Sequence, residues 1–463
     1  GVDVAADPHA VARQLFGVVL RHCRTEAGLS LRELGKRCHH DYSRLSRMET
    51  GDHLGDPALL AEIDLILGAG GLLTVLRTAA ELPSDPAGTV VVAPAVQMRT
   101  AGDGAPIVLE MRMTDGRSVR VSIPRREFSQ LIASGALRAV LPAGVLNLDE
   151  ADRLARVMRQ PSRVDPQVIG YFDRLLTEHY TADKILGPHQ LLGPVLAQLD
   201  ELETLRKHAR PPVAKPLLRV LARYAEFVGW LQQDAGDVPA AMYWSDRATQ
   251  WAQTAGDHQM VAYLLVRKSN IACQLDDANT VIELAAAAQD VPGDVDPKII
   301  ALAAQQEARG WAMISDVDHC RPKLDAAAEL LSKYSDEGGP AGPVYIQYYD
   351  LGVLEDQSAT CFRSIGRAED AIAIFERRIV ESLDANLHRD RGYQMAKLAN
   401  AVVATQQPEP ERAAQLGLTC LDLARRTGSA RIGKELHTLD ATLTTRWSDQ
   451  PDARAFHDAL TAL

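Results

Sequence analysis

The chain has 463 residues, which is too long for one ordinary hydrophobic core, so two or three domains are expected. Hydrophobic residues make up 46% of the sequence and charged residues 24%, as in a water-soluble globular protein. Apolar stretches such as residues 59–67 are interrupted by charges well before the roughly 18 residues that a membrane-spanning helix needs. We therefore expect no membrane association.

The six cysteines are scattered and none belongs to a Cys-x-x-Cys pair, which argues against a disulfide framework or a zinc ribbon. The first residues lack the basic and then apolar pattern of a secretory signal. The motifs His-Glu-x-x-His and Gly-x-Ser-x-Gly and the Walker-type phosphate loop do not occur in the sequence. We expect a cytoplasmic protein that is not an enzyme and holds no metal and no cofactor.

The net charge of −11 is unevenly distributed along the chain. Between Arg21 and Arg47 there are seven basic and three acidic side chains, whereas residues 81–463 carry a net charge of −10. The basic stretch is compatible with nucleic-acid binding, and the acidic remainder predicts weak non-specific affinity.

Residues 8–80 are predicted to form five short helices, on the basis of apolar spacing and capping residues. The predicted second helix covers residues 31–38 and the third covers residues 42–49. The residues expected to cap or end the helices are Asp7 and Gly28 for the first, Ser30 with Glu33 for the second, and Asp41 for the third.

The second and third helices form a helix-turn-helix pattern. Four apolar residues have the spacing that packs two helices at a steep angle: Leu34, Cys38, Leu45 and Met48. Gly35 is small where the helices would cross. His39 lies in the turn, where a left-handed backbone conformation is required.

Together with Gly28-Leu29-Ser30 and Met48-Glu49-Thr50-Gly51, this pattern resembles the phage-repressor-like (XRE-type) helix-turn-helix family over about residues 10–80. The sequence departs from the family at His39, where glycine is usual, so the turn is expected to be slightly strained.

The resemblance implies that the third helix enters the major groove of double-stranded DNA. It implies that Tyr42, Ser43 and Arg47 face the bases, with Arg47 able to contact guanine through two hydrogen bonds. Three further residues are expected to meet phosphates: Thr25, Arg32 and Arg44. Arg24 and Glu49 match family positions that pair inside the domain.

Residues 84–165 differ in character and predict a small β-containing linker domain. β-Branched or alternating residues predict strands over residues 89–92, 107–113 and 119–123, and Asp115-Gly116 is typical of a hairpin turn. A helix is expected over residues 126–134.

From residue 166 to the end, the sequence predicts amphipathic helices with Gly, Asp and Pro at intervals of about 15–20 residues, a pattern typical of paired-helix repeats. The clearest unit begins at Gly366 and includes Ala371 and Phe375. Its small and aromatic positions match the second half of a tetratricopeptide repeat. Because a single repeat cannot bury its apolar face alone, we expect a stacked superhelix.

A row of polar residues recurs at repeat spacing, with Arg267, Glu307, Gln357 and Lys397 separated by 40, 50 and 40 residues. Asn270, Gly310, Thr360 and Asn400 follow three residues later, on the same helix face. First helices line the concave groove of such superhelices, so a site for an extended peptide is predicted from five residues: Arg267, Asn270, Gln357, Lys397 and Asn400. The alternative is a solvated inner surface without a ligand.

The sequence thus predicts a mainly α protein with three parts: a five-helix helix-turn-helix domain (residues 1–83), the β-containing linker domain (84–165) and a tetratricopeptide-like α-superhelix (166–463). This layout resembles bacterial helix-turn-helix/tetratricopeptide regulators, including peptide-pheromone sensors and those of filamentous actinobacteria. The resemblance implies a homodimeric transcriptional regulator that senses a peptide or small molecule. The alternatives are a protein-interaction scaffold, and a DNA-binding protein whose repeats only dimerise.

Overall fold

The structure is a computed structural model of the chain and describes residues 8–69, 73, 74, 76, 77, 95–100, 105–112, 118–126, 128, 129, 148–183, 187–336, 342–381 and 388–462. It is mainly α-helical, as predicted, with one small antiparallel sheet. The chain folds into two compact units, residues 1–179 and 180–463, which are described separately.

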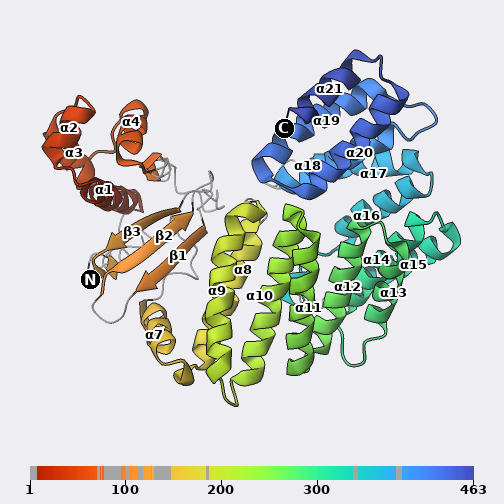
Figure 1. The fold of residues 1–463 in the computed structure, drawn as a ribbon, viewed down its shortest axis with the longest axis horizontal. Helices are drawn as coiled ribbons and strands as arrows, with labels where there is room; N and C mark the ends of the chain where they lie inside the picture. Colours follow the sequence, from red (N-terminus) through yellow and green to blue (C-terminus); the bar gives the residue numbers. More distant parts are fainter. Residues whose placement is uncertain are drawn as a thin grey trace. The chain divides into compact units, whose positions relative to one another are not determined.

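The first unit begins with four helices: α1 (Pro8–Glu26), α2 (Leu31–Arg37), α3 (Tyr42–Glu49) and α4 (Pro57–Leu67) (Figure 1). The predicted capping box is confirmed, because Ser30 Oγ accepts from the Glu33 amide at 3.2 Å and Glu33 Oε2 accepts from the Ser30 amide at 2.7 Å. Asp41 caps α3, also as predicted, by accepting from the Ser43 amide at 2.8 Å. The predicted cap Asp7 and most of the predicted fifth helix lie outside the described residues.

Helices α2 and α3 pack through the four predicted apolar residues, Leu34, Cys38, Leu45 and Met48, all of which are buried. A Cβ atom at Gly35 would lie 2.6 Å from the His40 carbonyl oxygen, so only glycine fits the crossing. His39 has a φ of +54°, which confirms the left-handed turn. Helix α1 also approaches α3 closely at Gly17, a contact that was not predicted, because a Cβ atom there would lie 2.4 Å from the Glu49 carbonyl oxygen.

A three-stranded antiparallel sheet with the order β1-β2-β3 follows, formed by β1 (Ala95–Thr100), β2 (Ile107–Arg112) and β3 (Ser118–Ile123). The strands predicted over 107–113 and 119–123 are confirmed, whereas β1 was not predicted. The predicted strand 89–92, the turn at Asp115-Gly116 and most of the predicted helix 126–134 lie outside the described residues.

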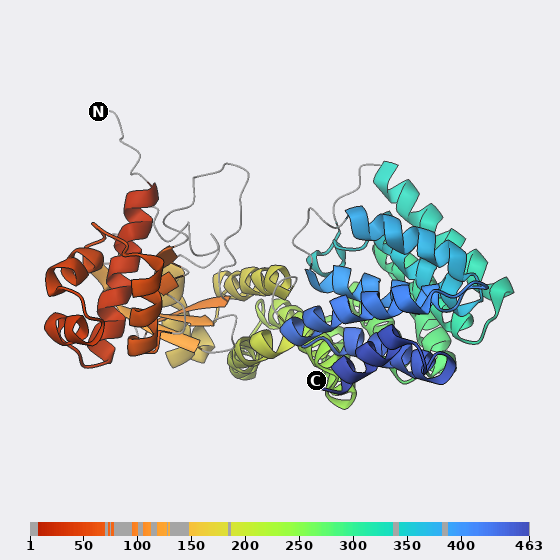
Figure 2. The same cartoon turned by 90° about the horizontal axis from the view of Figure 1, so that it is seen from above.

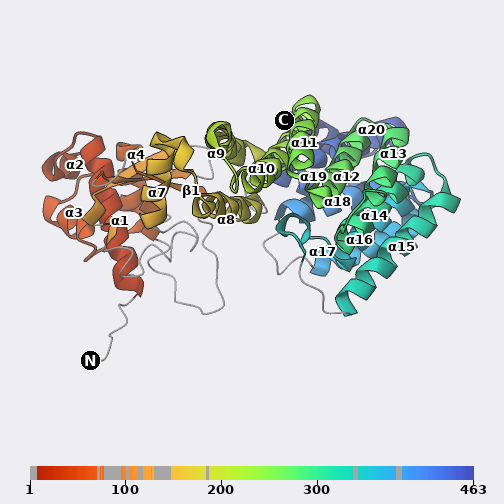
Figure 3. The ribbon, with the colours of Figure 1, turned by 90° about the horizontal axis from the view of Figure 1, so that it is seen from below.

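One face of this sheet is buried, because Met98, Leu109 and Val121 stand opposite one another in the register and each is at most 3% exposed. Helix α7 (Leu148–Arg159), also not predicted, packs beside β1 (Figure 3). The backbone of β3 meets α1, since His22 Nε2 lies 3.1 Å from the Arg120 carbonyl oxygen and 3.4 Å from the Ser122 nitrogen. The sheet and the helix-turn-helix therefore pack as parts of one unit.

A 3-10 turn (Pro161–Arg163) precedes α8 (Pro166–Asp183), whose last residues begin the second unit. Consecutive helices of this unit pack against each other in pairs (Figure 1). They are α9 (Pro188–His208), α10 (Ala214–Ala235), α11 (Val238–Ala255), α12 (His258–Gln274), α13 (Ala278–Gln289), α14 (Pro297–Met313), α15 (Val317–Asp336), a 3-10 turn (Val344–Ile346), α16 (Leu351–Ser364), α17 (Ala368–Glu381), α18 (His388–Val402), α19 (Pro410–Thr427), α20 (Ala430–Arg446) and α21 (Pro451–Thr461). No helix among the described residues has the length and apolarity needed to cross a membrane.

Three of the turns between these helices end in an aspartate that caps the following helix. Asp237, Asp257 and Asp277 each cap the next helix by accepting from the amide three residues later, at 2.9, 3.0 and 3.1 Å. The predicted repeat unit is also confirmed: α16 and α17 form a helical hairpin, and Ala371 and Phe375 are fully buried in it.

The end of the chain returns to the beginning of the second unit. Asp234, at the end of α10, is fully buried and accepts from Ser429 Oγ at 2.8 Å and from Arg431 Nε at 2.9 Å. Figure 2 shows the blue C-terminal helices lying beside the green helices of the same unit, in agreement with the contact between α10 and α20. Polar side chains of alternate helices also contact one another inside this unit, between α10 and α12, α12 and α14, α16 and α18, and α18 and α20.

Candidate DNA-binding site and polar interior of the repeats

Helix α3 divides into a buried and an exposed side. Leu45 and Met48 are fully buried, whereas Ser43 and Arg47 are exposed and lie one helical turn apart. Tyr42, at the first position of the helix, is 50% exposed. The residues predicted to read bases are therefore accessible on the first two turns of α3.

The Arg47 guanidinium forms no hydrogen bond or ion pair with any described residue, although the Arg47 carbonyl accepts from the Thr50 hydroxyl at 3.0 Å. A free, exposed guanidinium keeps all its donors for a partner. Such a group can form two hydrogen bonds with O6 and N7 of guanine.

Two of the predicted phosphate-contacting residues border this surface. Arg32, on α2, is exposed and lies with its guanidinium carbon 5.5 Å from the centre of the Tyr42 ring, a cation–π distance. Thr25 is exposed near the end of α1, where its hydroxyl donates to the Arg21 carbonyl at 2.7 Å. Both side chains are accessible to a phosphate backbone.

The third residue predicted to contact phosphate, Arg44, already has an ion-pair partner. Its Nη2 lies 3.1 Å from Asp56 Oδ2, and the two side chains are 32% and 50% exposed. The Leu59 amide, and to a lesser extent Arg44, hold the pKa of Asp56 below its usual value. Because exposed ion pairs contribute little to stability, a phosphate could displace this carboxylate at little cost.

The predicted internal pair Arg24–Glu49 is confirmed, and it links α1 to α3. Arg24 Nε lies 2.5 Å from Glu49 Oε1, and Arg24 Nη2 donates to Glu49 Oε2 at 3.1 Å. Arg24 Nη1 also donates to the Leu29 carbonyl at 2.7 Å, which ties α3 to the start of α2. Glu49 is 6% exposed, so it does not belong to the DNA-facing surface.

Comparison with known proteins agrees with this reading of the N-terminus, since residues 15–76 match a family described as helix-turn-helix domains. No curated protein matches the chain. The chain is similar to a solved structure of a signal transduction ATPase with numerous domains, with a tetratricopeptide repeat sensor, from Pyrococcus horikoshii. The two are 11% identical with a TM-score of 0.37, and the match covers 73% of this chain and 50% of the other, so the chain spans about half that protein's length.

The polar row predicted in the repeats lies on alternate helices, as the spacing required. Arg267 is on α12, Gln357 on α16 and Lys397 on α18. Its side chains do not, however, form an open groove surface. Arg267, Lys397 and Asn400 are 8%, 3% and 7% exposed, while Asn270 and Gln357 are half-buried.

Arg267 is held by protein groups on α10 and α12. Its Nε lies 3.1 Å from Glu226 Oε1, and its Nη2 donates to Gln233 Oε1 at 2.6 Å. Gln233 Nε2 donates in turn to Asn270 Oδ1 at 2.8 Å. Burial raises the pKa of Glu226 to about 7, and the neighbouring Arg267 partly opposes this shift.

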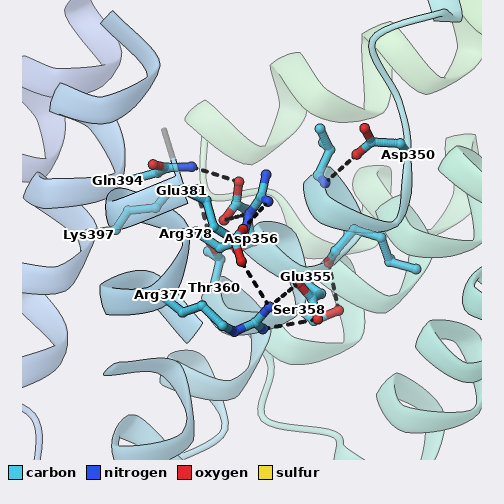
Figure 4. A network of polar contacts seen from close by, with 12 residues as sticks. Asp350, Glu355, Asp356, Ser358, Thr360, Arg377, Arg378, Glu381, Gln394 and Lys397 are labelled. Atoms are coloured by element: carbon cyan, nitrogen blue, oxygen red, sulfur yellow. Dashed lines mark hydrogen bonds and ion pairs between the residues drawn. The ribbon is translucent and has the colours of Figure 1, made fainter. Parts of the chain in front are cut away.

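Asn400 and Lys397 belong to a second cluster. Asn400 Nδ2 donates to both the carbonyl oxygen and Oε2 of Glu435, each at 2.9 Å. Lys397 Nζ donates to Thr360 Oγ1 at 3.0 Å and lies 4.2 Å from the centre of the Tyr393 ring. Figure 4 shows Lys397 and Thr360 beside the contacts that Asp356 makes with Arg378 and Gln394.

These contacts show that Arg267, Asn270, Lys397 and Asn400 already bond to other protein groups, and the binding of a ligand by these side chains stays a prediction. A charge that is removed from water needs a partner, and the interior supplies Glu226 and Glu435 for this purpose. These two carboxylates, on α10 and α20, were not predicted as partners. Among the described residues, no three His, Cys, Asp or Glu side chains gather to hold a metal ion.

Burial lowers the pKa of Lys397 to about 7, because the ammonium group loses its hydration. The carboxylate of Glu435 opposes this shift, Arg309 and Arg363 add to it, and Asp356 opposes it weakly. Lys397 therefore exchanges its proton near neutral pH.

This shift predicts a pH-dependent stability. Between a folded-state pKa of about 7 and the ordinary value of 10.5, the unfolded chain binds a proton that the folded chain lacks. The free energy of unfolding should therefore rise with pH in this window, by at most about 1.4 kcal/mol per pH unit from this group. We expect Lys397→Met to remove that rise, measured as the difference between the two proteins in urea denaturation at several pH values. Parallel pH dependence of both proteins would contradict the assignment.

Proposed function

We propose that the chain is a sequence-specific DNA-binding transcriptional regulator, which acts by binding and not by catalysis. The observation that carries this proposal is that Tyr42, Ser43 and Arg47 are exposed on α3, a helix that the partly buried Arg24–Glu49 ion pair holds to α1. Exposed side chains on a rigidly held helix suit the reading of base edges.

The proposal includes a homodimer that responds to a signal. One α3 helix buries little surface, whereas two copies reach half-sites about one helical turn of DNA apart. The helical repeats are the part proposed to dimerise and to bind the signal. A signal can change DNA affinity only if it binds two arrangements of the dimer unequally.

A second candidate is a DNA-binding protein whose repeats only dimerise. The internal bonding of Arg267 and Asn400 favours it, because these side chains already have protein partners. In this case no small ligand would alter the affinity for DNA.

The test is selection of bound sequences from a random DNA pool by the full-length chain. We expect enrichment of a two-fold symmetric site with half-sites about 10 base pairs apart. The matched control is the Tyr42→Ala/Arg47→Ala double variant, which should enrich no sequence while keeping its helical circular dichroism signal. Equal enrichment by both proteins, or by neither, would overturn the proposal.

A further inference from the structure

We propose that the interior of the repeat unit holds a binding site for a small carboxylate- or phosphate-bearing molecule, centred on Arg309 of α14 and Lys397 of α18. This inference rests on the proposed signal-sensing function and adds the chemical class of the signal. The inference rests on the partners of the buried cations and carboxylates around these two residues.

The carboxylates near these two cations are already engaged. Glu435 of α20 lies 2.9 Å from Arg363 Nη1 and also accepts from Asn400. Asp356 of α16 lies 3.3 Å from Arg378 Nε and accepts from Gln394 at 2.8 Å (Figure 4). Each carboxylate therefore has a strong partner other than Arg309 and Lys397.

Arg309 has no carboxylate oxygen within ion-pair distance among the described residues. Its Nη1 atom is buried and has no hydrogen-bond partner there. The groups that act on the guanidinium are the thiols of Cys273 and Cys361 and the phenol of Tyr393, which are neutral at pH 7, and then the carboxylate of Glu435, which is paired with Arg363. An arginine with an unmet donor and a mainly neutral surrounding is costly to keep in a protein interior.

Lys397 is also buried without a carboxylate in direct contact with its ammonium group among the described residues. It is 3% exposed, and the contacts of its ammonium group are the Thr360 hydroxyl and the Tyr393 ring. Arg309 and Arg363 act on it as like charges. An anion close to both Arg309 and Lys397 would accept from the unmet Arg309 donor and favour the protonated form of Lys397.

The interior also contains accessible aromatic surface. Tyr348 is 49% exposed, and desolvation raises the pKa of its phenol, with Arg267 and Arg431 among the charges that act on it. The guanidinium of Arg431 lies between two aromatic rings, 4.5 Å from Trp230 and 4.9 Å from Tyr393. A ligand with an anionic end and a flat or apolar body matches this combination of cations and rings.

The test uses the full-length protein with two probes, succinate and inorganic phosphate, titrated at constant ionic strength against potassium chloride. We expect at least one probe to raise the melting temperature in a saturable manner. Arg309→Gln and Lys397→Met should each abolish this rise. The matched control, Arg377→Gln, removes an exposed cation that is paired with Glu355 and should respond like the wild type.

A response to succinate alone would assign a carboxylate ligand, and a response to phosphate alone would assign a phosphoryl ligand. Absence of a saturable rise with both probes would overturn the inference, as would an equal rise in the two interior variants. If Arg309→Gln does not fold, Lys397→Met decides the test.

The same probes separate this inference from the proposed function. A saturable rise that depends on Arg309, combined with unchanged operator affinity, would leave the anion site in place and refute signal sensing. DNA binding without any anion effect would refute the site and leave the DNA-binding function in place.

Discussion

Replacing Arg47 by alanine is expected to abolish sequence-specific DNA binding while leaving the helical content unchanged. The side chain is exposed on α3 and has no protein partner among the described residues, so its removal costs the fold little. A two-hydrogen-bond contact to guanine is worth about 1–3 kcal/mol, and a dimer loses it at both half-sites. The specific affinity should therefore fall by about 30-fold or more, since each 1.4 kcal/mol is a factor of ten.

Arg47→Lys is the matched control for this prediction. Lysine keeps the charge but cannot form the paired hydrogen bonds of a guanidinium, so non-specific DNA affinity should survive while operator preference is lost. Both effects are measured by titration of operator and scrambled duplexes at one salt concentration. Unchanged operator affinity of Arg47→Ala would show that α3 contacts DNA through another register.

The local features of the helix-turn-helix were predictable because their causes lie within a few residues. Ser30 and Glu33 are three positions apart, and Asp41 caps the helix that it immediately precedes. His39 takes a positive φ as expected, although glycine would adopt it more easily. Short-range rules of this kind need no knowledge of the tertiary fold.

Long-range pairings were not predictable in the same way. Periodicity identifies the helix face that carries Arg267 but not the carboxylate that meets it, because Glu226 lies 41 residues earlier. The contact between Asp234 and Ser429 joins residues 195 positions apart, and it exists only because the last helices return to α10. The spacing of the polar row placed its residues on alternate helices as predicted, but the helices that supply their partners were unknown.

The ion pair between Arg24 and Glu49 is expected to contribute strongly to the stability of the first unit. We expect Glu49→Ala to lower the free energy of unfolding by about 3 kcal/mol, because it leaves a partly buried guanidinium without its counter-charge. The loss also removes the tie from α3 toward the start of α2 that passes through Arg24. Urea denaturation of the full-length protein, followed by a probe in the first unit, measures this change.

The matched control for Glu49→Ala is Glu62→Ala, which removes an exposed carboxylate of α4 with no hydrogen bond or ion pair among the described residues. Surface substitutions of this kind usually change stability by less than about 0.5 kcal/mol. Below its melting transition, Glu49→Ala should still prefer the same operator, because the buried carboxylate does not face DNA. Unchanged stability together with a new operator preference would instead make Glu49 a base-reading residue, and α3 would then have to present a different face to the major groove.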